Sequence, residues 1–270
     1  MNMLTLDQQS AVRLTAFFGI FALMAVWEVV APRRVLRVSK YARWFTNLSI
    51  TFLNSLVGRY LLPITATWLA LSAQAQGWGI LNYLNVPSLL AGVISIAILD
   101  AAIYAQHFFF HKIRFFWSFH GMHHTDLDID VTTGARFHPV EIAMSLVIKM
   151  GLIILIGIPA WSFLLFEMLL NGTSMFNHSN VRINTKIDRF LRLVLVTPDM
   201  HRVHHSVIIK ERDSNFGFNL PWWDRIFGTY QSQPAAGHDN MVIGLANFRD
   251  PNGLTLPRLL TLPFVMGRKL

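Results

Sequence analysis

Four long apolar runs, separated by shorter polar stretches, organise this chain. A helix that crosses the hydrocarbon core of a bilayer needs about 20 mostly apolar residues. The runs cover residues 12–31, 47–71, 89–106 and 140–176. The first three predict single membrane spans, although Arg59 and Pro63 interrupt the second. The fourth run contains a Gly-Ile-Pro break at residues 157–159, which predicts two helices folded as a hairpin instead of one straight span.

The charges between these runs predict how the chain crosses the membrane. Cytoplasmic loops carry an excess of Lys and Arg. The loop after the first run has five basic residues and no acid, namely Arg33, Arg34, Arg37, Lys40 and Arg43. Residues 72–87, by contrast, carry no charge. We therefore expect the first loop and everything after Asn177 to face the cytoplasm. No small-residue cleavage site follows the first run, so we expect it to be a retained anchor.

Composition supports an integral membrane protein. Of the 270 residues 53% are hydrophobic and 14% are charged, whereas charged residues make up about a quarter of a typical soluble domain. The net charge of +8 is spread beside apolar segments and does not form a basic stripe, so we expect no nucleic-acid partner. The sequence predicts an all-α, polytopic membrane bundle of about 3 spans plus the hairpin, with a cytosolic, histidine-rich helical cap.

Eight of the eleven histidines fall into three groups with helical spacing. The groups are His107-x-x-x-His111, His120-x-x-His123-His124 and His201-x-x-His204-His205. Residues three and four positions apart share one face of a helix, with β-carbons roughly 5 to 6 Å apart. We expect the first histidine of each HxxHH triple to share its face with both later ones. Because a structural zinc takes four ligands, eight imidazoles predict two metal ions of four or five coordination.

Three histidines lie outside these groups. His138, at the entrance to the hairpin, is compatible with a metal ligand, a donor to a ligand or an interfacial residue. His178 follows the hairpin on the side of the three groups, and its position favours ligation as much as a structural role. We expect His238, in the Gly- and Pro-flanked tail, to be interfacial. The chain has no cysteine, so thiolate ligands and iron–sulfur clusters are excluded.

In order and spacing the three groups resemble the motifs of the membrane fatty acid hydroxylase and sterol desaturase superfamily. Further features that resemble the family are Asp100, Trp117, His138-Pro139-x-Glu141, Asn177-His178-Ser179, Pro198, Asn215-Phe-Gly-Phe-Asn and Trp223-Asp224-Arg225-Ile-Phe227-Gly228-Thr229-Tyr230. The resemblance covers roughly residues 90–232. The two N-terminal spans match the family only in character.

The resemblance implies a cytosol-facing site with two iron ions, which uses dioxygen and external electrons to hydroxylate or desaturate a lipid. It implies ligation by the eight grouped histidines and by His178, and we keep His138 as a further candidate ligand. It also implies a hydroxylase-like catalytic domain at 89–232, between anchor spans at 1–88 and a loop-rich tail at 233–270. Members act on fatty acyl chains, sterols, alkylglycerols and carotenoids. Since imidazole suits iron, zinc, copper and nickel alike, the preference for iron comes from the resemblance, and a purified sample can hold zinc.

The electrons must come from a separate carrier, such as a ferredoxin or a cytochrome, because the chain has no dinucleotide fingerprint, haem-attachment motif or cysteine. Basic residues of the cytosolic side would dock an acidic carrier or, as the simpler alternative, contact anionic headgroups. They include Lys112, Arg114, Arg182, Lys186, Arg189, Arg192, Lys210 and Arg212.

Carboxylates are expected to support the histidines by accepting the outer N–H groups of the imidazoles. The candidates are Asp100, Glu141, Asp199 and Asp224. Salt bridges to Arg136, Arg202 or Arg225 are the alternative role for each of these acids.

Two other functions are compatible with clustered histidines. A metal transporter or sensor would distribute its ligands within the spans, whereas these groups flank the spans on one side. A catalytically silent protein with a structural dizinc site would keep the same ligands. Hydroxylation and desaturation begin with the same hydrogen abstraction, and of the two we expect hydroxylation.

Overall fold

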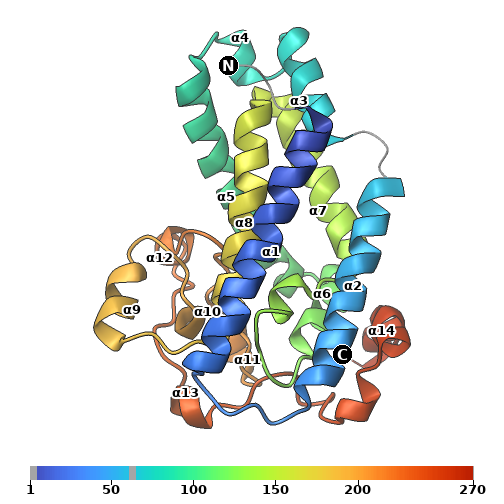
Figure 1. Ribbon diagram of the computed structural model, residues 1–270, viewed down its shortest axis with the longest axis vertical. Helices are drawn as coiled ribbons and strands as arrows, with labels where there is room; N and C mark the ends of the chain where they lie inside the picture. Colours follow the sequence, from blue (N-terminus) through green and yellow to red (C-terminus); the bar gives the residue numbers. More distant parts are fainter. Residues whose placement is uncertain (1–4, 61–64, 270) are drawn as a thin grey trace.

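The computed structural model describes residues 5–60 and 65–269, which fold into an all-helical protein (Figure 1). Within these residues extended segments pair only as the isolated bridges Pro32–Val181 and Ser206–Ile243. The predicted all-α bundle with a histidine-rich cap is confirmed.

Three helical segments are long and apolar enough to cross a membrane. They are α1 (Leu6–Val30), α5 (Ser88–Lys112) and the continuous segment formed by α7 (Pro139–Leu152) and η2 (Ile153–Gly157). Helix α8 (Ala160–His178) packs against both α1 and α5. Figure 1 shows these helices running along the long axis of the molecule, with the cap at its lower end.

The second expected span, 47–71, is divided between two helices. Helix α2 (Lys40–Tyr60) begins before this run, and α3 (Ala66–Ala75) is a separate helix that begins within the run and ends after it. Neither is among the helices long and apolar enough to span. The first turns of α2 carry polar side chains that contact the cap and are buried there, which sequence hydropathy does not register. Pro63, expected to interrupt this span, lies outside the described residues.

The expected hairpin is present and turns at Gly157. This residue has a φ of +80°, a left-handed conformation that favours glycine. A Cβ added to it would lie 2.7 Å from the Asn82 amide nitrogen and 2.9 Å from the Trp78 carbonyl oxygen. Pro159 then precedes the first turn of α8, whose last residue is His178. The hairpin thus returns the chain to the end of the bundle that holds the other histidines.

Short helices and loops form the cap below the bundle. They are α6 (Arg114–His124), η1 (Thr133–Ala135), α9 (Thr185–Leu191), α10 (Pro198–His204), α11 (Ile209–Arg212), α12 (Trp222–Ile226), α13 (Gly237–Asn240) and η3 (Pro251–Gly253). The one-turn helix α4 (Ile80–Tyr83) lies at the opposite end of the molecule (Figure 1).

The tail expected to be loop-rich, 233–270, ends in a long helix, α14 (Leu256–Lys269). Leu259, Leu262 and Met266 share one face of α14 and pack in a buried cluster with Trp117 of α6. Prolines in this segment favoured a loop in the sequence. Pro263 lies inside the helix nevertheless, because burial of the apolar face outweighs the backbone hydrogen bond that proline removes.

Arg43 of α2 is a buried cation that fixes the loop between α6 and α7. Its guanidinium donates to both carboxylate oxygens of Asp126, at 2.6 and 2.9 Å, and to Asp130 at 2.6 Å. Burial by itself raises the pKa of Asp126, but Arg43 and Arg136 outweigh it and lower that pKa to about 2. The pair is therefore ionised at neutral pH. The loop that it holds includes Arg136, whose carbonyl contacts a histidine of the site.

Arg43→Ala should destabilise the protein strongly, because it leaves two buried carboxylates without their cation. The expected loss is about 3–5 kcal/mol of unfolding free energy, measured by denaturation in detergent. Arg37→Ala is the matched control. The Arg37 side chain is exposed and only its backbone N–H bonds to Asp128, so its loss should stay within about 0.5 kcal/mol. Equal effects of the two changes would contradict this role of Arg43.

Candidate metal centre

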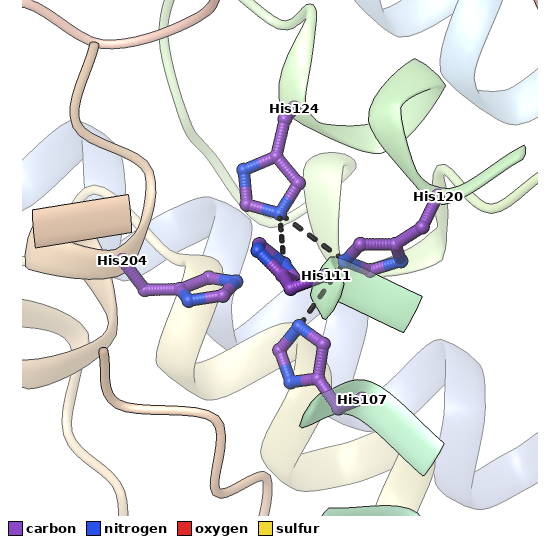
Figure 2. Close-up of side chains that lie close together, drawn as sticks. All are labelled: His107, His111, His120, His124 and His204. Atoms are coloured by element: carbon purple, nitrogen blue, oxygen red, sulfur yellow. Dashed lines mark hydrogen bonds between the residues drawn. The ribbon is translucent and has the colours of Figure 1, made fainter. Parts of the chain in front are cut away.

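Nine histidines, the eight grouped ones and His178, meet in two adjoining clusters in the cap. The first cluster contains His107, His111, His120, His124 and His204 (Figure 2), and the second contains His123, His178, His201 and His205. Within each cluster the ligand-capable atoms all lie within 4.8 Å of one another. The two clusters touch, since the rings of His124 and His205 stack with centroids 4.7 Å apart. The arrangement has the donors for two neighbouring metal ions.

Each HxxHH motif divides its histidines between the two clusters. Successive residues of an α-helix are turned by about 100°, so positions i+3 and i+4 lie on opposite sides of position i. On α6, His120 and His124 therefore point into the first cluster and His123 into the second. At α10 the assignment is reversed, because His204 joins the first cluster while the histidines on either side of it in the motif join the second. The first histidine of each motif is thus in the same cluster as the i+4 histidine, while the i+3 histidine joins the other cluster.

His178 completes the second cluster from the end of α8. Its Nε2 lies 3.1 Å from Nε2 of His123 and 3.0 Å from Nε2 of His201. On its other side, the Nδ1–H donates to the carbonyl oxygen of Ser174, one helical turn earlier, at 2.7 Å. A histidine outside the three motifs therefore supplies the fourth donor of this cluster.

Backbone carbonyls around the clusters determine which ring nitrogen carries the proton. A carbonyl oxygen can only accept, so the imidazole nitrogen that faces it must be the N–H. The Nδ1–H groups donate from His107 to Phe216 (2.7 Å), from His204 to Ser214 (2.7 Å) and from His123 to Arg136 (3.1 Å). His120 makes the same outward bond to the carboxylate of Glu141, at 2.7 Å. In these rings Nε2 is the nitrogen with the free lone pair.

These unprotonated nitrogens face one another inside the clusters. Nε2 of His107 lies 3.1 Å from Nε2 of His120, and the same distance separates Nε2 of His123 from Nε2 of His178. A dashed line joins His107 and His120 in Figure 2. Burial, and then the neighbouring histidines, hold the pKa of His123 and of His201 well below 6.5. Protonation of His123 or His201 therefore does not relieve the contacts of the second cluster at neutral pH, whereas a cation between the nitrogens would. The donor set therefore fits bound metal.

His138, the further candidate ligand, lies outside both clusters. Its Nδ1 accepts the backbone N–H of Val140 at 3.1 Å and so caps the start of α7, while its Nε2–H donates to the carbonyl of Leu260 at 3.2 Å. Both ring nitrogens are thus used away from the metal centre. His238 also lies outside, 3.8 Å from Asp199, and it is buried instead of interfacial.

Of the four acids expected to support the ligands, Glu141 contacts one directly. Asp224 contacts a clustered histidine only through the backbone of Phe216. Its carboxylate accepts the Phe216 N–H at 2.7 Å, and the Phe216 carbonyl accepts the Nδ1–H of His107. Asp100 binds the segment that follows, through the side chains of Asn219 and Trp223. Asp199 instead takes the alternative role, in ion pairs with Arg33 and Arg202.

Asp213 is a supporting acid that no sequence motif singled out. Its carboxylate lies 3.3 Å from Nδ1 of His111 and 2.7 Å from the ammonium of Lys112. It reaches them from the end of α11, 102 residues further along the chain than His111. A contact over that separation has no local spacing by which the sequence could reveal it.

Comparisons with known proteins agree with this geometry. Residues 92–229 match the family model described as fatty acid hydroxylase, a segment that contains all nine clustered histidines. The ornithine lipid hydroxylase OlsE of Rhizobium tropici is 30% identical over 142 residues, which are 53% of this chain and 42% of that protein. An alkylglycerol monooxygenase of Homo sapiens is 29% identical over 149 residues, 55% of this chain and 31% of that protein.

An alkylglycerol monooxygenase of Danio rerio is 28% identical over 182 residues, 66% of this chain and 38% of the relative. This chain therefore spans less than half the length of each of these three relatives. No solved structure matches the chain significantly.

Two histidine substitutions should separate ligation from local structure. We expect the purified protein to hold about two metal ions per chain, and His178→Ala to lower this to about one, because the second cluster is left with fewer than four donors. His138→Ala should retain the full metal content, since both nitrogens of His138 bond elsewhere. Elemental analysis by plasma mass spectrometry measures the difference. Equal metal loss in both variants, or none in His178→Ala, would refute the assignment.

Substitution of Glu141 should weaken metal binding without removing a ligand. Glu141→Ala leaves the Nδ1–H of His120 without its acceptor, so we expect a 10–100-fold loss of metal affinity. Glu141→Gln should lose less, because the amide oxygen of glutamine still accepts this N–H. Competition with a chelator measures the affinity of each variant. Wild-type affinity in Glu141→Ala would show that the contact does not position the ligand.

Proposed function

Because the chain belongs to the fatty acid hydroxylase family, we propose that it is a membrane-bound oxidoreductase that uses dioxygen and external electrons to hydroxylate a lipid-like substrate. The observation that carries this proposal is the convergence of unprotonated imidazole nitrogens in two adjoining buried clusters. The relatives are named as an ornithine lipid hydroxylase and alkylglycerol monooxygenases, and these names support insertion of oxygen over desaturation.

The nine clustered histidines would hold two iron ions, with five candidate ligands around one and four around the other. Bound iron would supply the redox chemistry for breaking an unactivated C–H bond with dioxygen, which amino-acid side chains lack. The preference for iron over zinc rests on the family, because imidazole accepts both metals.

The residues around the clusters prepare this donor set. In five of the nine histidines, outward hydrogen bonds keep the proton on Nδ1, so their Nε2 lone pairs point inward without rearrangement on metal binding. These are His107, His120, His123, His178 and His204. Phe137 stacks on His123 with ring centroids 4.5 Å apart, and Trp117 lies 4.9 Å from His111. These rings exclude water from the ligands beside them. Since nine neutral imidazoles leave the charge of bound cations uncompensated, the carboxylate of Glu141, bonded to His120, would offset part of it.

The electron donor would be a separate carrier on the cytoplasmic side, of the ferredoxin or cytochrome type. The basic loop at residues 33–43 supports this orientation of the cap. An acidic carrier would complement the exposed basic side chains of the cap, among them Lys112 and Lys210.

Comparative lipid profiling of a host membrane tests this function. Expression of the chain should produce lipid species heavier by one oxygen atom, and His204→Ala, which removes a donor of the first cluster, should abolish them. His138→Ala is the control and should retain the products, because His138 lies outside both clusters. Species lacking two hydrogen atoms would indicate desaturation instead. Iron-loaded protein that, given electrons and dioxygen, consumes no oxygen and modifies no host lipid would overturn the proposal.

A further inference from the structure

Six large apolar side chains project from one flank of the cap and form a surface that we call the apolar platform. Ile187, Phe190 and Leu193 belong to α9 and the turn after it, and Trp222, Ile226 and Phe227 belong to α12 and its end. These side chains are between 46% and 70% exposed. The two parts lie together, since the indole N–H of Trp222 donates to the carbonyl of Leu193 at 2.6 Å. Such a contiguous exposed apolar surface marks a site of interaction.

The outward charges around the platform are positive. Lys186 and Arg189 of α9 and Arg225 of α12 are exposed. The acids of these two helices, Asp188 and Asp224, are both buried. Apolar side chains bordered by Lys and Arg are typical of helices that lie in the interface of an anionic membrane leaflet.

Contacts of the platform with α5 give its depth in the membrane, and this estimate does not depend on the residue types in the platform. Phe227 stacks on Tyr104 of α5 with ring centroids 5.4 Å apart, and Thr229 is hydrogen-bonded to the Tyr104 hydroxyl at 2.9 Å. At 1.5 Å per residue, Tyr104 lies about 12 Å before the cap end of α5 at Lys112. A helix of 25 residues is about 37 Å long, whereas the hydrocarbon core is about 30 Å thick. If α5 crosses the core fully, Tyr104 and the platform beside it lie within the lipid.

We propose that the apolar platform inserts into the inner leaflet of the membrane, with Ile187, Phe190 and Ile226 among the acyl chains near the headgroups. The cap is then partly submerged and does not stand free in the cytoplasm. His107 follows Tyr104 by less than one helical turn, so the histidine clusters lie at about the same depth as the platform. A lipid would reach them by lateral movement in the leaflet, without leaving the membrane.

The lack of cysteine in the chain makes a direct test possible. Single cysteines replace Phe190 and Ile226 in the platform, Leu23 on the exposed face of α1 as the lipid reference, and Gln233, an exposed polar residue of the cap, as the water reference. Each is labelled with an environment-sensitive fluorophore in nanodiscs of phosphatidylcholine and phosphatidylglycerol. Quenching by brominated acyl chains and by aqueous iodide is then compared. Ile187→Cys serves as a further platform site if one of the first two variants does not fold.

Labels on the platform should be quenched by brominated lipid at roughly half the efficiency of the Leu23 label or more, as expected for insertion of about 5–10 Å. They should also be shielded from iodide, while the Gln233 label shows the reverse. Platform labels that behave like the Gln233 label would overturn the proposal. Labels shielded from both quenchers would overturn it as well, and would indicate a protein partner or a second copy of this chain on the surface. None of these readouts depends on catalysis, so they stand apart from the test of the proposed function.

Discussion

Unprotonated imidazole nitrogens lie about 3 Å apart in the buried cap, and the rest of the site depends on that constraint. Their lone pairs repel each other, and the low dielectric of a buried site strengthens the repulsion. Carbonyl groups of Phe216, Ser214, Ser174 and Arg136 nevertheless keep the protons on the outer nitrogens. A cation between the rings turns the repulsion into attraction, so metal binding and the stability of the cap are coupled.

The elements that supply these carbonyls come from distant parts of the chain, and each is secured by its own contacts. The Arg136 carbonyl depends on the loop that Arg43 holds through Asp126 and Asp130. The Phe216 carbonyl depends on Asp224, which binds its N–H. On the outside, α14 packs over α6 and covers the helix that provides three of the clustered histidines. Ion pairs and apolar packing outside the two clusters therefore determine how the clustered histidines are arranged.

The arrangement of the clustered histidines does not determine which lipid is the substrate. The imidazoles and their carbonyl acceptors would hold metal in the same way whatever the lipid, so selection of the substrate would come from the surfaces that guide a lipid to the clusters. With the apolar platform of α9 and α12 inserted as proposed, the inner leaflet would be the source of the lipid. The part of each of the three relatives that this chain matches is less than half of that relative's length.

Local spacing by itself determined much of this protein. The apolar runs predicted α1, α5 and the hairpin, because a membrane span is defined by length and composition alone. The HxxxH and HxxHH groups predicted eight of the nine clustered histidines, because helical periodicity places such residues close together before any tertiary contact exists. Only the tertiary structure decided which histidine joins which cluster, that His178 joins them and His138 does not, and that Asp213 supports His111. It also revealed α14, whose buried face outweighs its internal proline. These features depend on contacts between residues far apart in the chain, and no periodicity along the sequence records them.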